Sequence, residues 1–89
     1  MARMEIPEES WAEIAPQAAS ADILFEFGMK YCIGRGVEQD YVSAHKWFNL
    51  AALKGSIEAR TYRCELSREM TADQVYEAQR QARAWLTLQ

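Results

Sequence analysis

Two glycines, Gly34 and Gly36, stand one residue apart, and Asp40 follows them at the start of an apolar segment. Such glycines occur in phosphate-binding loops, but those loops lie between a strand and the N-terminus of a helix. Here the residues before Gly34 have the apolar spacing of a helix, and Asp40 would place a negative charge where a phosphate should bind. No Gly-Lys-Ser/Thr sequence follows. The pattern therefore favours a tight turn between two packed helices over a phosphate site.

The remaining residue types that do chemistry in proteins are sparse. His45 is the single histidine and lies off the predicted buried stripe of its helix, so we expect it at the surface. One histidine without a cysteine or carboxylate cluster is not a metal site, and no serine or cysteine has a base beside it. Cys32 and Cys64 belong to no CxxC motif, and we expect both as small apolar residues on buried helix faces. The sequence therefore predicts a protein that is not an enzyme, with no metal and no cofactor.

The elements that position these residues are helices. Apolar spacing predicts helices at about 20–33, 41–54, 57–69 and 72–88, and no segment alternates long enough to predict a strand. Ser20, Asp40 and Thr71 have the residue types of helix N-caps, and Gln74 completes a capping box with Thr71. Gly28 lies inside the first helix at a cost of about 1 kcal/mol relative to alanine, which indicates close approach of a neighbouring helix backbone. Short connections predict that sequential helices pack as antiparallel hairpins.

The domain organisation follows from these spans. We expect residues 1–19 to form an N-terminal arm or short helix and residues 20–89 to form one helical domain. The chain of 89 residues has a net charge of -3, which argues against a nucleic-acid partner. The sequence has no run of about 18 apolar residues, so it predicts no membrane span. The N-terminus lacks the apolar region of a secretory signal. We therefore expect no membrane partner and a cytoplasmic location.

A set of residues at fixed spacing runs through the first two predicted helices and the turns that follow them. Its members are Phe27, Gly28, Tyr31, Gly34, Gly36, Val37, Asp40, Ala44, Trp47, Ala51, Ala52 and Gly55. Through them the stretch 23–59 resembles the Sel-one-like repeat, a relative of the tetratricopeptide repeat, and the likeness extends less closely to residue 87. All of them match the family pattern except Phe27, which replaces its leucine. The resemblance is to short bacterial proteins with one such repeat. It implies an all-α, short helical-hairpin solenoid of about one and a half repeats, in which the last helix is a C-terminal cap.

The resemblance also indicates where a partner would bind, because tetratricopeptide-like folds line a concave face with the first helix of each hairpin. Here the positions off the motif are Glu26, Lys30, Arg60 and Arg63. Three of them are basic, so such a face would receive an acidic peptide or a carboxylate; the alternative is an ordinary solvated helix surface.

Two tryptophans, Trp11 and Trp85, lie near the ends of the chain. We expect them either to pack against each other or an adjacent helix, or to form an exposed apolar patch at an interface.

The function we expect is non-catalytic protein–protein interaction, as an adaptor or regulatory subunit. The first alternative is a module that senses a small ligand or metabolite in a pocket between arm and hairpins. The second is a self-assembling structural protein, such as a homodimer with Trp11 or Trp85 at the seam.

Overall fold

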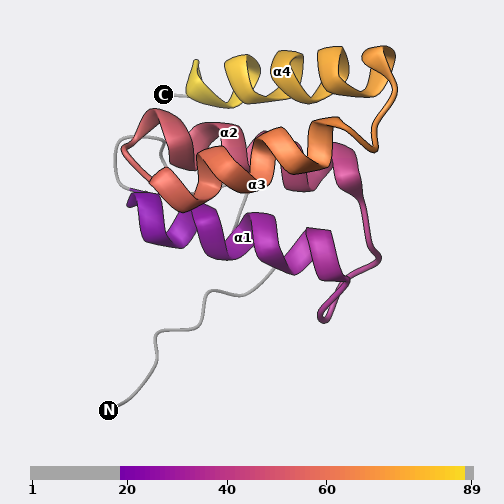
Figure 1. Ribbon diagram of the computed structural model, residues 1–89. Coiled ribbons are helices and arrows are strands. Elements are labelled where there is room, and N and C mark those ends of the chain that lie inside the picture. The colour runs from indigo at the N-terminus through magenta and orange to yellow at the C-terminus, as the bar shows by residue number, and fades with distance from the viewer. Residues whose placement is uncertain (1–18, 88–89) are drawn as a thin grey trace.

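The computed structural model describes residues 19–87, so the predicted arm with Trp11 lies outside the described residues except for Ala19. The described part consists of α-helices without a strand, as predicted (Figure 1). The bounds differ from the predicted ones by no more than two residues. The helices are α1 (Ala21–Ile33), α2 (Tyr41–Leu53), α3 (Ile57–Ser67) and α4 (Ala72–Leu86).

The helix starts follow from the residues before them. Ser20 Oγ accepts a hydrogen bond from the Ile23 N–H at 3.2 Å, and Asp40 accepts from the N–H groups of Val42 and Ser43. Before α4, Thr71 and Gln74 form the reciprocal capping box. These caps confirm the prediction, and each contributes about 1 kcal/mol by satisfying N–H groups that have no partner within the helix.

The glycine pair forms the turn between α1 and α2. Gly34 adopts a left-handed conformation at φ 73°, and Gly36 has φ 76°, so both positions suit glycine. The N–H groups of Gly34 and Arg35 both donate to the Lys30 carbonyl, at 2.9 and 3.0 Å. These two N–H groups are committed to the end of α1 and are not available to hold a phosphate, which supports the turn interpretation.

Helix α2 is the centre of the fold, because α1, α3 and α4 all pack on it (Figure 1). Gly28 of α1 faces Phe48 of α2, and a methyl group at position 28 would lie 2.5 Å from Phe48 Cε1. The close approach is thus confirmed, but the neighbour is a side chain and not the expected backbone.

Aromatic rings connect α2 to its neighbours in two rows. Phe27, Trp47 and Trp85 form edge contacts at centroid distances of 5.0 and 5.4 Å, which join α1, α2 and α4. On the other side, Tyr62 of α3 stacks on Phe48 at 5.5 Å and meets Phe25 of α1 at 5.7 Å. The two rows fix three helices against α2 with rigid side chains.

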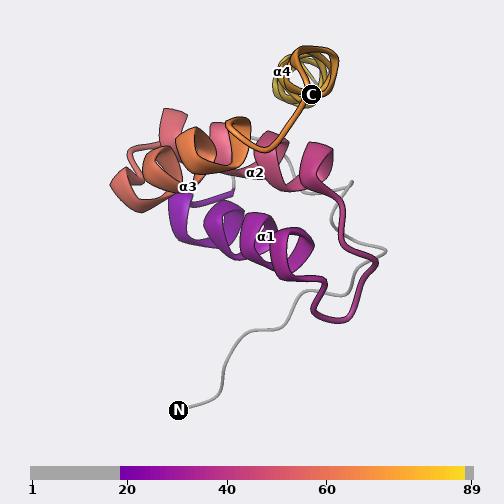
Figure 2. The ribbon, with the colours of Figure 1, turned by 45° about the vertical axis from the view of Figure 1, so that its right-hand side comes forward.

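The prediction of sequential hairpins holds for α1 with α2 and for α2 with α3, but it is wrong for α3 with α4. Helix α4 packs on α2 and stands apart from α3 (Figure 2). The apolar stripe of α4 (Ala78, Ala82 and Trp85) is buried. Helix α3 has only Ala59 and Leu66 fully buried, so it has no second apolar face to offer α4.

Candidate functional site

His45 is buried in the structure, with 2% of its surface exposed, so the predicted surface position is wrong. The predicted surface position assumed that α2 buries one apolar stripe against a single neighbouring helix. Because α2 has three helical neighbours, its buried sector is wider than that stripe and includes position 45. Burial, with a smaller contribution from the positive charge of Arg63, lowers the pKa of His45 below its ordinary value of 6.5.

The hydrogen bonds of His45 define its protonation. Its Nε2 lies 2.9 Å from Ser67 Oγ, and that hydroxyl donates to the Arg63 carbonyl at 2.9 Å. Since a hydroxyl has one proton to donate, the imidazole must be the donor to Ser67, and its Nδ1 is a buried acceptor without a partner. A nucleophilic serine would instead donate to the histidine. The geometry therefore favours a structural pair over an activated serine.

The predicted basic residues differ in their surroundings. Tyr62 marks the side of α3 that meets Phe25 of α1. Arg60 is two residues earlier, about 200° around the helix, so it lies on a different side of α3 from Tyr62. Arg63 is half-buried and donates to Asn49 Oδ1 of α2 at 2.7 Å. Arg60 is exposed, and of the three basic residues it is the one most accessible to a partner.

The other predicted contact residues have different environments. Glu26 is exposed on α1. Trp85 is 5% exposed and packs edge-on against Trp47, so it follows the alternative of packing on an adjacent helix. Trp11 lies outside the described residues, and a contact between the two tryptophans therefore stays a prediction.

The cysteines also differ from expectation. Cys64 is exposed on α3, so its prediction as a buried residue is wrong; it lies on the side of α3 opposite the buried Leu66. Cys32 is half-buried, and burial together with the negative charge of Glu69 raises the pKa of its thiol.

A pocket that sequence reasoning missed lies between α2 and α4. Its volume is about 250 Å³, and its lining residues are Lys46, Arg80, Gln81, Ala84 and Trp85. The Lys46 ammonium lies 4.3 Å from the ring centroid of Trp47, a cation–π contact. Partial burial lowers the pKa of Lys46, and the charge of Asp40 opposes that shift. No sequence motif marks this pocket, because it depends on how α4 crosses α2.

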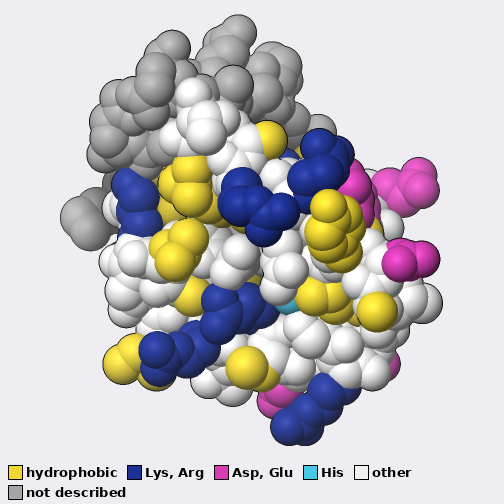
Figure 3. All heavy atoms as spheres, turned by 90° about the horizontal axis from the view of Figure 1, so that it is seen from above, with side chains coloured by type: hydrophobic (Ala, Val, Ile, Leu, Met, Phe, Trp, Pro, Cys, Tyr) yellow, Lys and Arg dark blue, Asp and Glu magenta, His cyan; other side chains and the backbone are white. Residues whose placement is uncertain are grey.

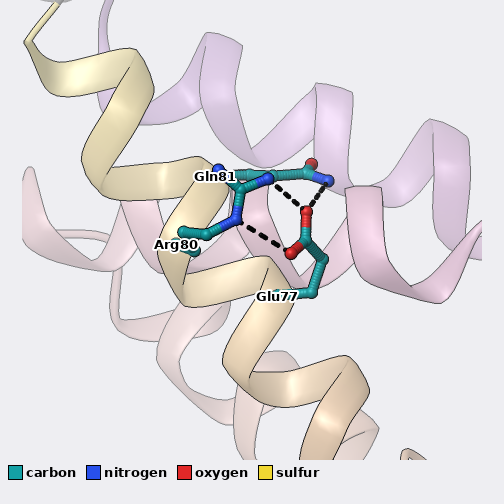
Figure 4. Close-up of polar contacts among 3 residues, drawn as sticks. All are labelled: Glu77, Arg80 and Gln81. Atoms are coloured by element: carbon teal, nitrogen blue, oxygen red, sulfur yellow. Dashed lines mark hydrogen bonds and ion pairs between the residues drawn. The ribbon is translucent and has the colours of Figure 1, made fainter.

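One wall of the pocket is ordered by a carboxylate. Glu77 accepts from Arg80 Nε at 2.9 Å, from Arg80 Nη2 at 2.6 Å and from Gln81 Nε2 at 2.9 Å (Figure 4). These hydrogen bonds, Arg80 first, lower the pKa of Glu77 to about 2. The fork of two hydrogen bonds holds the Arg80 guanidinium in one orientation beside the pocket.

The face on which α4 lies carries Lys and Arg side chains interleaved with hydrophobic ones (Figure 3). Asp and Glu side chains appear mainly toward the margins of this view. A carboxylate-bearing partner would therefore meet more positive than negative charge on this side.

Two of the most exposed large hydrophobic residues flank one turn. Leu53, the last residue of α2, is 64% exposed, and Ile57, the first residue of α3, is 77% exposed. Arg60 follows Ile57 by three residues, so the two side chains are neighbours along α3. We call Leu53, Ile57 and Arg60 the α2–α3 tip.

Residues 19–87 contain no group of three or more His, Cys, Asp or Glu side chains that could hold a metal ion. In the same part of the chain, every helix is too short or too polar to cross a membrane. Comparisons with protein families, curated proteins and solved structures found no significant match.

Proposed function

We propose that this chain is a non-catalytic protein-interaction module, an adaptor or regulatory subunit, in which the hairpins form a short solenoid like that of the Sel-one-like repeat. The α2–α3 tip is its primary contact surface. The observation that carries the proposal is the exposure of two large apolar residues, Leu53 and Ile57, at the two ends of one turn. Exposed apolar surface on a folded domain is typical of interaction sites.

The energetics of the tip favour a protein partner. Covering the exposed part of each apolar side chain would contribute about 1–2 kcal/mol to binding. Arg60 beside them would donate charge-assisted hydrogen bonds to a carboxylate. The tip therefore suits an apolar segment with an acidic residue next to it, in agreement with the acidic partner that we expect from the sequence.

The described fold leaves the tip open to a partner. Leu53 and Ile57 stay largely exposed, although α2 packs against α1, α3 and α4. The His45–Ser67 pair offers no activated serine, since Ser67 donates its proton to a backbone carbonyl.

The test is affinity capture of the tagged chain from a lysate of its own host, with crosslinking mass spectrometry. Leu53→Asp/Ile57→Asp removes the apolar tip, Arg60→Glu reverses its charge, and Gln79→Glu is a control at an exposed position on α4. We expect one stoichiometric partner that crosslinks next to the tip. Both tip variants should lose it, and the control should retain it.

Two results would contradict the proposal. One is a partner captured equally by all variants, and the other is turnover of a substrate by the purified chain alone. Capture of the chain by itself, lost in the tip variants, would instead favour the self-assembling alternative, and sedimentation velocity would then give the oligomeric state.

A further inference from the structure

We infer that the pocket between α2 and α4 is a binding site for a monocarboxylate with a small apolar body. This inference does not rest on the proposed function, because the pocket involves none of the residues of the α2–α3 tip. Lys46 reaches the pocket from α2, and Arg80, Gln81, Ala84 and Trp85 line it from α4.

The charges at the pocket leave one positive charge without a counterion. Arg80 is paired with Glu77 through two hydrogen bonds, so that pair contributes no net charge. Lys46 has no ion pair among residues 19–87. Burial lowers the pKa of Lys46, and the negative charge of Asp40 opposes that shift. The Asp40 carboxylate, however, already accepts hydrogen bonds from the N–H groups of Val42 and Ser43 and from the Ser43 hydroxyl.

A half-buried ammonium without an anion has lost part of its hydration, and a carboxylate that binds it would offset that loss. The Arg80 guanidinium is already oriented by Glu77, so a ligand that contacts both cations would not have to order it. One surplus positive charge fits one carboxylate better than a phosphate dianion.

The lining limits the rest of the ligand. The pocket is a shallow groove, largely open to solvent, with a volume of about 250 Å³, so it can hold only a small group against its apolar wall. Ala84 and the Trp85 ring supply apolar surface, so the body attached to the carboxylate should be a short aliphatic group. Such a group comes either from a free branched-chain acid or from the C-terminal residue of another polypeptide.

The experiment is a titration of the ¹⁵N-labelled full chain followed by ¹H–¹⁵N correlation spectra. The probes are isovalerate and its neutral analogue isovaleramide, and the peptide acetyl-Ala-Leu with a free C-terminus and its C-terminal amide. Gln81, Ala84 and Trp85 line the pocket, so their backbone amide resonances report on binding there. We expect saturable shifts at these three residues with isovalerate, at a Kd of about 1–10 mM, and none with the amide.

Variants connect the shifts to the charges. Lys46→Gln should weaken isovalerate binding about tenfold, the loss of one charge-assisted hydrogen bond. Arg80→Gln should weaken it further, since it also leaves the Glu77 carboxylate to repel the probe. Arg83→Gln, an exposed position on α4 outside the pocket lining, is the matched control and should bind as the wild type does.

The inference is overturned if isovaleramide binds as well as isovalerate, if Lys46→Gln leaves the affinity unchanged, or if no pocket resonance shifts at 50 mM probe, about five times the weakest Kd expected. If acetyl-Ala-Leu binds at least about tenfold more tightly than isovalerate, the site recognises a chain terminus; otherwise the ligand is a free acid. Partner capture by Lys46→Gln separates this inference from the proposed function, because that variant retains the α2–α3 tip.

Discussion

Gly28 faces the ring of Phe48, and the substitution Gly28→Ala tests whether this contact sets the distance between α1 and α2. The added methyl group would lie 2.5 Å from Phe48 Cε1 and 3.0 Å from Cγ, closer than carbon atoms pack without a shift. Phe48 is fully buried and contacts the rings of Phe25 and Tyr62, which also contact each other, so the ring has little room to move.

Two opposing effects decide the sign of the change in stability. Alanine favours a helix interior over glycine by about 1 kcal/mol. Forcing an extra methyl into a packed core costs about 1–3 kcal/mol. We therefore expect Gly28→Ala to lower the free energy of unfolding by up to about 2 kcal/mol, against the direction of helix propensity.

The assay is urea unfolding followed by circular dichroism at 222 nm, carried out in the wild type and in a Phe48→Leu background. With the smaller leucine the clash is relieved, and Gly28→Ala should become neutral or stabilising. The double-mutant cycle should give a coupling free energy of about 1 kcal/mol or more. The reasoning is refuted if Gly28→Ala stabilises the wild type, or if it changes the stability equally in both backgrounds.

Three further predictions concern titration and reactivity. The pKa of His45 is lower in the folded chain, so the unfolded chain takes up a proton first as the pH falls below about 6.5, and the free energy of unfolding should decrease with the pH there. His45→Gln should flatten this pH dependence. An unchanged pH dependence in that variant would count against a buried neutral imidazole. The carboxyl ¹³C resonance of Glu77 should titrate with a midpoint of about 2, and Arg80→Gln should move that midpoint toward 4.5; an ordinary midpoint in the wild type would mean that the ion pair does not persist in solution. Iodoacetamide should modify the exposed Cys64 before Cys32, whose thiol has a raised pKa, as peptide mass spectrometry can measure; faster modification of Cys32 would contradict the packing of α1.

The helices could be predicted from the sequence because their ends depend on local chemistry. The cap residues Ser20, Asp40 and Thr71 and the left-handed Gly34 act on the backbone within a few residues, so their effect is visible without knowledge of the fold. The buried stripe of α2 was predicted for the same reason, since the period of a helix relates neighbouring positions directly.

The position of α4 and the burial of His45 depend on contacts between distant segments. Apolar spacing shows that α4 has a face to bury, but it does not show whether that face meets α2 or α3. Since α4 packs on α2, the pocket beside Lys46 exists only in the assembled fold. The exposure of Ile57 could not be predicted from the sequence either, because it depends on which helices pack beside the start of α3.

The most direct test of the central claim is site-specific photocrosslinking in living cells of the host. Benzoylphenylalanine is placed at Ile57, within the α2–α3 tip, or at Tyr76, an exposed position on α4. We predict that position 57 crosslinks to one other protein and that position 76 does so weakly or not at all. Equal crosslinking from both positions, or none from position 57, would contradict the assignment of the tip as a protein-binding surface.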